Sequence, residues 1–296
     1  MRCNAPQEQM NKKVLVIALA LLGAGALPCQ ADNTSEDKEL GLSFEVGADL
    51  VSSYIWRGQN LGGLSLQPSI TLGWQGVYLS GWWNVGTDNW RFQNFNPEMD
   101  LTVGFDRWGV QVDLTHYYYF GGESFLLDNC DMTLEDNAAR STMELHAGFH
   151  LGDIVENVPL YIDWYTTVLG GDGYLTNPDD PTTLKRAYST YIQLGYDFEL
   201  PLGTVIAARV GLTPWRGAYS GYEEVWTNAG TVALTNLNLR VEHEFEIGDI
   251  TLSVFAEGML NCYGIDKTNV ITKLTDRSEQ RLNGCIGGSF YFGKDW

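Results

Sequence analysis

Hydrophobic and polar residues alternate along most of the chain, and the pattern is clearest in residues 42–57. The even positions from Leu42 to Trp56 are mostly apolar, and the odd positions from Ser43 to Arg57 are mostly small, polar or charged. A period of two places successive side chains on opposite faces of a β-strand and fits no helix. At about 16 residues, the segment is longer than an ordinary strand of about 5–6 residues. Such a length is typical of a tilted strand that crosses a membrane and projects past it.

The same alternation predicts further strands, and their connections alternate between short turns and long loops. Short turns follow the second, fourth, sixth, eighth and tenth predicted strands, and long loops follow the odd-numbered ones. Short periplasmic turns and long extracellular loops are typical of outer-membrane barrels, and an even strand count brings both chain ends to one side. We therefore predict an all-β fold, an antiparallel up-and-down transmembrane β-barrel of about twelve strands. After residues 42–57 the predicted strands cover residues 66–74, 77–85, 98–105, 110–120, 143–150, 160–165, 188–199, 205–212, 236–245, 250–257 and 281–292.

The N-terminal segment has the pattern of an export signal. Lys12 and Lys13 precede an apolar run over residues 14–22, and small residues lead to a cleavage site after Ala31. The apolar run is too short to cross a bilayer as a helix, and no later run approaches the roughly 18 apolar residues that such a helix needs. The alternative is a lipoprotein modified at Cys29. We expect a cleaved signal peptide over residues 1–31, a short flexible leader over residues 32–41 and the barrel over residues 42–296.

A secreted β-sandwich would also alternate, because it too has one apolar face. The alternating connection lengths, the aromatic C-terminal strand and aromatic residues at strand ends favour the membrane, where such residues form interfacial girdles. We therefore expect the cell outer membrane, with its lipids and lipopolysaccharide as surroundings. The predicted lipid-interface aromatics are Tyr54, Trp56, Trp74, Trp83, Tyr188, Phe290 and Phe292.

The inward-facing positions are rich in acids, and the whole chain has a formal charge of −19. This charge argues against binding to nucleic acid or anionic surfaces. Rings of carboxylates in a lumen favour cations, so one interpretation is a pore for small cationic or neutral solutes. The alternative is an internal salt-bridge network that plugs the barrel, since twelve strands lie between filled barrels of about 8 strands and channels of about 16–18. The candidate lumen residues are Glu45, Asp49, Arg57, Asp100, Asp113, Glu144, Asp163, Asp197, Arg209, Arg240, Glu242 and Glu257.

One part of the chain resembles a known family. The stretch GADLVSSYIWRG at residues 47–58, followed by LQPSI at residues 66–70, resembles the opening hairpin of Gram-negative outer-membrane proteins described as TorF-type porins or as conserved hypothetical proteins. The similarity extends over residues 44–86, and beyond them only the strand pattern matches. The resemblance implies a barrel with a pore role and names no substrate.

The remaining residues form no catalytic or metal-binding motif. Outer-membrane lipases of twelve strands use Ser, His and Asn on the barrel wall. Here His146 and His150 face inward without a motif-bearing serine, so we predict no enzyme and no catalytic residue. The acids in residues 128–136 and 177–180 do not have the spacing of a calcium loop, and a solvated acidic loop is the preferred interpretation. We therefore predict no metal and no cofactor.

Arg57 and the cysteines leave alternatives open. Arg57 is expected either to reach into the lumen and pair with an acid such as Asp100 or Asp113, or to be a structural residue at the strand rim. Cys262 and Cys285 flank the last long loop and are too far out of register for a direct disulfide. Cys130 lies on another long loop and is the remaining candidate partner for either one.

Overall fold

A computed structural model describes most of the predicted barrel. The described residues are 41–86, 98–119, 141–155, 158–175, 184–215, 217, 219, 232–262 and 282–295. The predicted signal peptide and residues 32–40 of the leader lie outside this set. Among the described residues, no helix is long and apolar enough to span a membrane.

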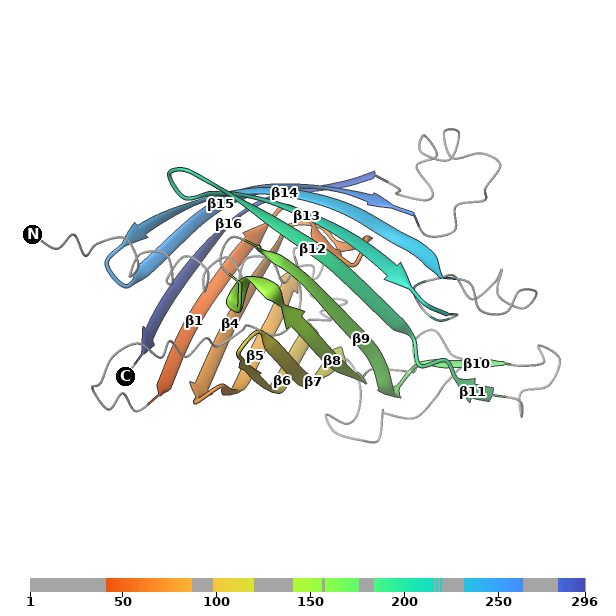
Figure 1. The fold of residues 1–296 in the computed structure, drawn as a ribbon. Helices are drawn as coiled ribbons and strands as arrows, with labels where there is room; N and C mark the ends of the chain where they lie inside the picture. The colour runs from red at the N-terminus through yellow and green to blue at the C-terminus, as the bar shows by residue number, and fades with distance from the viewer. Residues whose placement is uncertain are drawn as a thin grey trace, which may run out of the picture.

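Twelve strands form one closed antiparallel barrel (Figure 1). Consecutive barrel strands pair with each other, and the last strand pairs with the first, with Ser43 opposite Asp295 and Val51 opposite Gly287. The fold class and strand number predicted from the alternation are thus confirmed. The barrel strands are β1 Leu42–Val51, β4 Ser65–Trp74, β5 Val77–Gly86, β6 Glu98–Arg107, β7 Val110–Tyr119, β8 Ser141–His150, β9 Leu160–Gly170, β12 Thr190–Leu200, β13 Thr204–Thr213, β14 Ala233–Ile247, β15 Ile250–Asn261 and β16 Leu282–Asp295.

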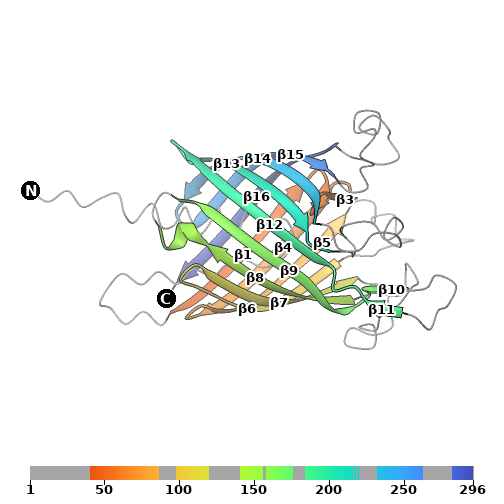
Figure 2. The same cartoon turned by 45° about the vertical axis from the view of Figure 1, so that its right-hand side comes forward.

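Short and long connections alternate around the barrel as predicted. One end carries the five short connections, such as Gln75–Gly76 between β4 and β5, where both residues have positive φ angles of 50° and 93°. Two-residue turns of this kind match the twist of the paired strands. At the other end, two long connections contain hairpins of their own. These are β2 Tyr54–Trp56 with β3 Gln59–Gly62, and β10 Gly173–Leu175 with β11 Leu184–Arg186, and the second extends beyond the barrel rim (Figure 2).

The barrel is apolar outside and polar inside. On β4, Leu72 and Trp74 are 48% and 58% exposed, whereas the alternate residues Ser65, Gln67 and Thr71 are buried. The same inversion holds on the other barrel strands, which expose Val, Leu, Ile and Phe side chains and bury Asp, Glu, Arg and Thr. A protein in water would place these two faces the other way round. The wall is therefore that of a membrane barrel rather than a soluble sandwich.

The first strand is shorter than predicted. β1 leaves the wall after Val51, and the Ser52 N–H donates to the Ile286 carbonyl at 2.9 Å. Residues 54–56 then pair with residues 59–62 instead of with the wall. The prediction of one continuous strand over residues 42–57 is therefore wrong in its final third. Alternation continues through the hairpin, and a period of two does not reveal which strand is the pairing partner.

The β2–β3 hairpin folds into the barrel. Its two-residue turn is Arg57–Gly58, with φ angles of 45° and 90°. Ile55 packs against a buried cluster that includes Phe255 on β15, and the Asn283 side chain on β16 donates to the Gly58 carbonyl at 3.3 Å. A Cβ atom at Gly58 would lie 2.9 Å from the Cβ of Asn236 on β14. The turn thus lies close to the inner face of the wall, where a side chain larger than hydrogen would collide.

The inverted wall makes a prediction about a single outward residue. Val103 lies near the middle of β6 and is 53% exposed. Because arginine at the bilayer midplane of a membrane barrel costs about 2–4 kcal/mol, Val103→Arg should lower the free energy of unfolding in phospholipid vesicles by that amount. Urea titration followed by tryptophan fluorescence measures it. Leu202→Arg, at an 88% exposed turn position, is the control and should have little effect. Equal effects of the two changes would contradict a lipid-facing wall.

Candidate functional site inside the barrel

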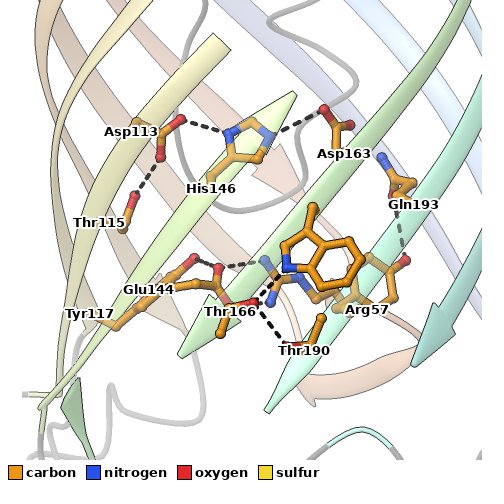
Figure 3. Close-up of polar contacts among 12 residues, drawn as sticks. Arg57, Asp113, Thr115, Tyr117, Glu144, His146, Asp163, Thr166, Thr190 and Gln193 are labelled. Carbon is orange, nitrogen blue, oxygen red and sulfur yellow. Dashed lines mark hydrogen bonds and ion pairs between the residues drawn. The ribbon is translucent and has the colours of Figure 1, made fainter. Parts of the chain in front are cut away.

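The turn of the β2–β3 hairpin brings a guanidinium group to the barrel interior. Two different nitrogens of Arg57 contact the two carboxylate oxygens of Glu144 on β8, each at 2.6 Å (Figure 3). The two side chains are only 7% and 3% exposed. This two-point contact uses the planar fork of arginine, which a point charge cannot reproduce. Of the two alternatives for Arg57, the structure has the one in which it reaches into the lumen and pairs with an acid. Its partner is Glu144 rather than Asp100 or Asp113.

Aromatic rings surround the same guanidinium group. Its central carbon lies 4.1 Å from the ring centroid of Tyr165 and 4.4 Å from that of Trp56. The rings of Tyr191 and Tyr219 lie at 4.9 and 5.3 Å, and Arg57 also donates a hydrogen bond to the Tyr219 hydroxyl. Cation–π attraction strengthens when the cation is removed from water.

Tyr117 completes the surroundings of Arg57 by donating to Glu144 at 2.9 Å. We define the Arg57 cage as the set of side chains that contact the guanidinium or its carboxylate partner. Its members are Trp56, Tyr117, Glu144, Tyr165, Tyr191 and Tyr219.

A second cluster is built around His146 on β8. Its Nδ1 atom lies 2.6 Å from a carboxylate oxygen of Asp113, and its Nε2 atom lies 3.1 Å from one of Asp163 (Figure 3). A carboxylate only accepts hydrogen bonds, so each ring nitrogen needs a proton to donate to its aspartate. The imidazole has a proton on both nitrogens in its cationic form. The ring of Tyr165 stacks on His146 at 4.3 Å between centroids, which connects this cluster to the Arg57 cage.

The two aspartates beside His146 have further partners. Asp113 accepts hydrogen bonds from Tyr78 at 2.9 Å and from Gln111 at 3.2 Å. The Nε2 atom of His150 lies 3.1 Å from Asp163. All of these groups lie on β5, β7, β8 or β9, so the cluster follows one part of the wall.

A third cluster lies on β13, β14 and β15. Arg240 contacts Glu242 at 3.0 Å and Glu257 at 3.8 Å, and Arg209 approaches Glu257 at 3.9 Å. The guanidinium of Arg240 also lies 3.5 Å from the ring centroid of Phe255. Ser253 donates to Glu242 at 2.5 Å. Charges of both signs are thus paired along this part of the wall.

Asp100 on β6 differs from the other interior acids. It is 1% exposed, and neither of its carboxylate oxygens accepts a hydrogen bond from the part of the protein that the structure describes. It lies close enough to Glu98 and Glu144 to repel both electrostatically. Because an ionised carboxylate is costly to bury without donors or a counter-charge, this part of the interior favours a cation or water.

The twelve lumen candidates lie on the inner face of the wall or, for Arg57, on the hairpin inside it. The structure joins Arg57 with Glu144, Asp113 with Asp163 through His146, and Arg209, Arg240, Glu242 and Glu257 with one another. Outside these clusters are Glu45, Asp49, Asp100 and Asp197; of these, Asp49 accepts a hydrogen bond from Tyr291 at 2.7 Å.

The aromatic predictions are corrected at two positions. Tyr54 is 4% exposed, and its ring packs 5.6 Å from that of Trp82. Trp56 packs against Tyr117 and Tyr219. The prediction of lipid-interface positions is wrong for Tyr54 and Trp56, because the hairpin carries both residues inward. Trp74, Trp83, Phe290 and Phe292 lie on the outer face, and Tyr188 is exposed next to the start of β12.

The tyrosines of the cage were not predicted as site residues. Tyr165 and Tyr191 have inward parity, but an inward tyrosine is equally expected as a packing residue that fills the lumen. Tyr219 follows β13 in a long connection, where no alternation indicates its direction. The signal that could have found them is the coincidence of Arg57 with several inward aromatics, which requires knowing that the hairpin folds inward.

Some of the residues in the metal and cysteine predictions are among those that the structure describes, and others are not. Within the described strands and connections, no group of three or more His, Cys, Asp or Glu side chains is placed to hold a metal ion. Cys262 and Cys285 form no disulfide with each other, as predicted. Cys130 and the acidic stretches at 128–136 and 177–180 lie outside the described residues.

Comparisons with known proteins give fold likenesses without a family. No protein-family model matches the chain, and no curated protein does, so the TorF-type resemblance stays a prediction. Among solved structures, the chain is similar to an outer membrane channel from Pseudomonas putida F1, with 14% identity, a TM-score of 0.43, and coverage of 89% of this chain and 100% of that one. The NanC porin has 10% identity, a TM-score of 0.41 and coverage of 85% and 99%. The P. putida toluene transporter TodX has 12% identity, a TM-score of 0.36 and coverage of 88% and 91%. At these identities and scores, the likenesses carry no argument about substrate or mechanism.

The His146 cluster makes a prediction about stability. In His146→Leu, Asp113 and Asp163 lose the cation between them, and breaking a buried charge pair typically costs about 3–5 kcal/mol. The free energy of unfolding, measured by urea titration in vesicles, should fall by roughly that amount. His243→Leu is a matched control, because His243 has outward parity on β14 and contacts Thr204 rather than an acid. A His146→Leu protein as stable as the His243→Leu protein would show that the bridge contributes nothing.

Proposed function

We propose that this chain is an outer-membrane channel for small solutes, with a lumen that prefers cations and a hairpin that restricts it. This proposal rests on which parts of the barrel the interior ion pairs connect. Those of the second and third clusters join residues on the same strand, on neighbouring strands or on next-but-one strands. Among the described residues, only the pair of Arg57 with Glu144 ties a segment from outside the wall to the wall. A network built to fill the lumen would instead connect opposite sides of the barrel.

The hairpin is separable from the wall. The ladder of twelve strands closes from β1 to β16 without any contribution from β2 or β3. Displacing the hairpin therefore leaves every backbone hydrogen bond of the wall in place, and the membrane does not oppose the movement.

The acids of the interior support a preference for cations. They outnumber the arginines and histidines there, and Asp100 is buried beside Glu98 and Glu144 with no described donor on its carboxylate. Carboxylates that line a constriction lower the energy of a cation relative to that of an anion.

A second candidate function is a barrel that does not conduct and serves as a structural or surface protein. The buried clusters and the inward hairpin favour it, because together they occupy the interior of a barrel of intermediate strand number. The two candidates differ in whether removal of the hairpin produces a path for ions.

Conductance in planar bilayers separates the two candidates. In the test variant, a short Gly-Ser link replaces residues 54–62, which should give larger single-channel conductance steps than the wild type because the hairpin leaves the lumen. A variant with a shortened β10–β11 hairpin is the control, because this hairpin lies beyond the rim (Figure 2). Folded, inserted protein that passes no current in either the wild type or the test variant would establish the structural barrel instead.

Asp100 makes a prediction about selectivity. Asp100 is buried beside Glu98 and Glu144, so its carboxylate becomes charged only when a cation or water lies next to it. Asp100→Asn removes that cation-binding group, so the reversal potential in a KCl gradient should move toward that of an unselective pore. Asp249→Asn removes an acid from an exposed turn and should leave the reversal potential unchanged. Equal reversal potentials for wild type and Asp100→Asn would show that Asp100 does not face the conducting path.

A further inference from the structure

We propose that the Arg57 cage is a binding site for organic cations that carry a guanidinium group, and that Arg57 is an internal occupant which such a solute displaces. The inference rests on the proposed channel function and names the solute class for it. Five of the six cage residues, all except Trp56, are outside the hairpin.

The cage recognises the shape of a guanidinium as well as its charge. Both oxygens of Glu144 accept from Arg57 at 2.6 Å, and they contact different nitrogens. A spherical cation has no N–H groups to direct at the two oxygens, and neither does a quaternary ammonium. Tyr219 accepts a further hydrogen bond from Arg57. The rings of Tyr165 and Tyr191 attract the cation through their faces.

The cage does not depend on the hairpin for its positions. Tyr117, Glu144, Tyr165 and Tyr191 lie on β7, β8, β9 and β12, which are consecutive in the barrel. Stacking against the imidazole of His146 holds the Tyr165 ring in place. The ring of Tyr191 lies 6.1 Å from that of Tyr165 and 5.5 Å from that of Tyr219. When the hairpin leaves, these residues remain assembled as an anionic site lined by aromatic rings.

The cage lies beside a second acid, Asp100, with which Arg57 does not pair. Arg57 pairs with Glu144, whereas Asp100 lies within electrostatic range of Glu144 and has no described donor. A solute with a second positive charge can answer this carboxylate while its guanidinium occupies the position of Arg57. Agmatine, which has a guanidinium at one end and an amine at the other, should therefore bind more tightly than guanidinium itself.

Arg57 competes with any free solute, because it is attached to the protein. A tethered ligand has an effective concentration of about millimolar or more. The wild type should therefore bind free guanidinium weakly, and removal of the Arg57 side chain should expose the site.

Isothermal titration calorimetry on the detergent-solubilised full-length protein tests the inference. Arg57→Ala should bind guanidinium and agmatine at least about tenfold more tightly than the wild type does, and should bind agmatine more tightly than tetramethylammonium or sodium. The double variant Arg57→Ala with Glu144→Gln should lose this binding. Arg107→Ala is the matched control, because Arg107 also stacks on a tryptophan, Trp108, but lies at the end with the tight turns. Its affinities should equal those of the wild type.

Two further variants keep the test decisive. Arg57→Lys retains a positive charge without the fork, and the variant shortened at residues 54–62 removes Arg57 with the whole hairpin. Heat-modifiable migration in SDS gels identifies the folded variants. The full gain in guanidinium affinity is expected in the shortened variant, and a smaller gain in Arg57→Lys, because the lysine ammonium still competes for Glu144. Folded variants that bind guanidinium no better than the wild type, or no better than tetramethylammonium, would overturn the inference. The titration requires no ion flow, so a positive result without conductance would reject the channel and retain the site.

Discussion

The structure depends on closure of one backbone ladder, the pairing of β1 with β16. A hydrocarbon environment offers no partner to an open strand edge, so each N–H and C=O in the spanning region needs a neighbour on both sides. Closure meets this requirement, and it also divides the side chains into an outward apolar set and an inward polar set. The acids and arginines of the interior are held there by the same geometry that turns the leucines and valines outward.

The interior charges are arranged by that geometry. Inward side chains on neighbouring strands are close enough to pair, and this is why His146 lies between aspartates from the strands on either side of its own. The same holds for Arg240, Glu242 and Glu257 on β14 and β15. Such pairs stiffen the wall without needing to cross the lumen. Asp100 lacks this compensation, and it lies close enough to be repelled by Glu144, the acid that binds the guanidinium of the hairpin.

The hairpin relates the fold to the proposed function. It is joined to the barrel at its two ends and seated through a few polar and aromatic contacts, whereas the wall is complete without it. The contacts that Arg57 makes at its turn are those that a free guanidinium would make, namely a two-point carboxylate, the Tyr219 hydroxyl and aromatic faces. Occupancy of the site by the protein itself and occupancy by a solute are then alternatives, and the balance between them sets how far the lumen is open.

The sequence by itself determined the barrel, because a period of two, repeated between alternating short and long connections, specifies both the strands and the two faces. It also determined which charged residues turn inward, since parity is a local property. Only the tertiary structure decided which of them meet. Tyr54 and Trp56 continue the alternation of β1, yet they lie inside the barrel because the chain leaves the wall at Ser52. Likewise, Arg57 contacts Glu144 and tyrosines from β9, β12 and a long connection, all of them far from it in the chain. Barrel closure and the inward fold of the hairpin bring these residues together, and no local sequence pattern indicates such contacts.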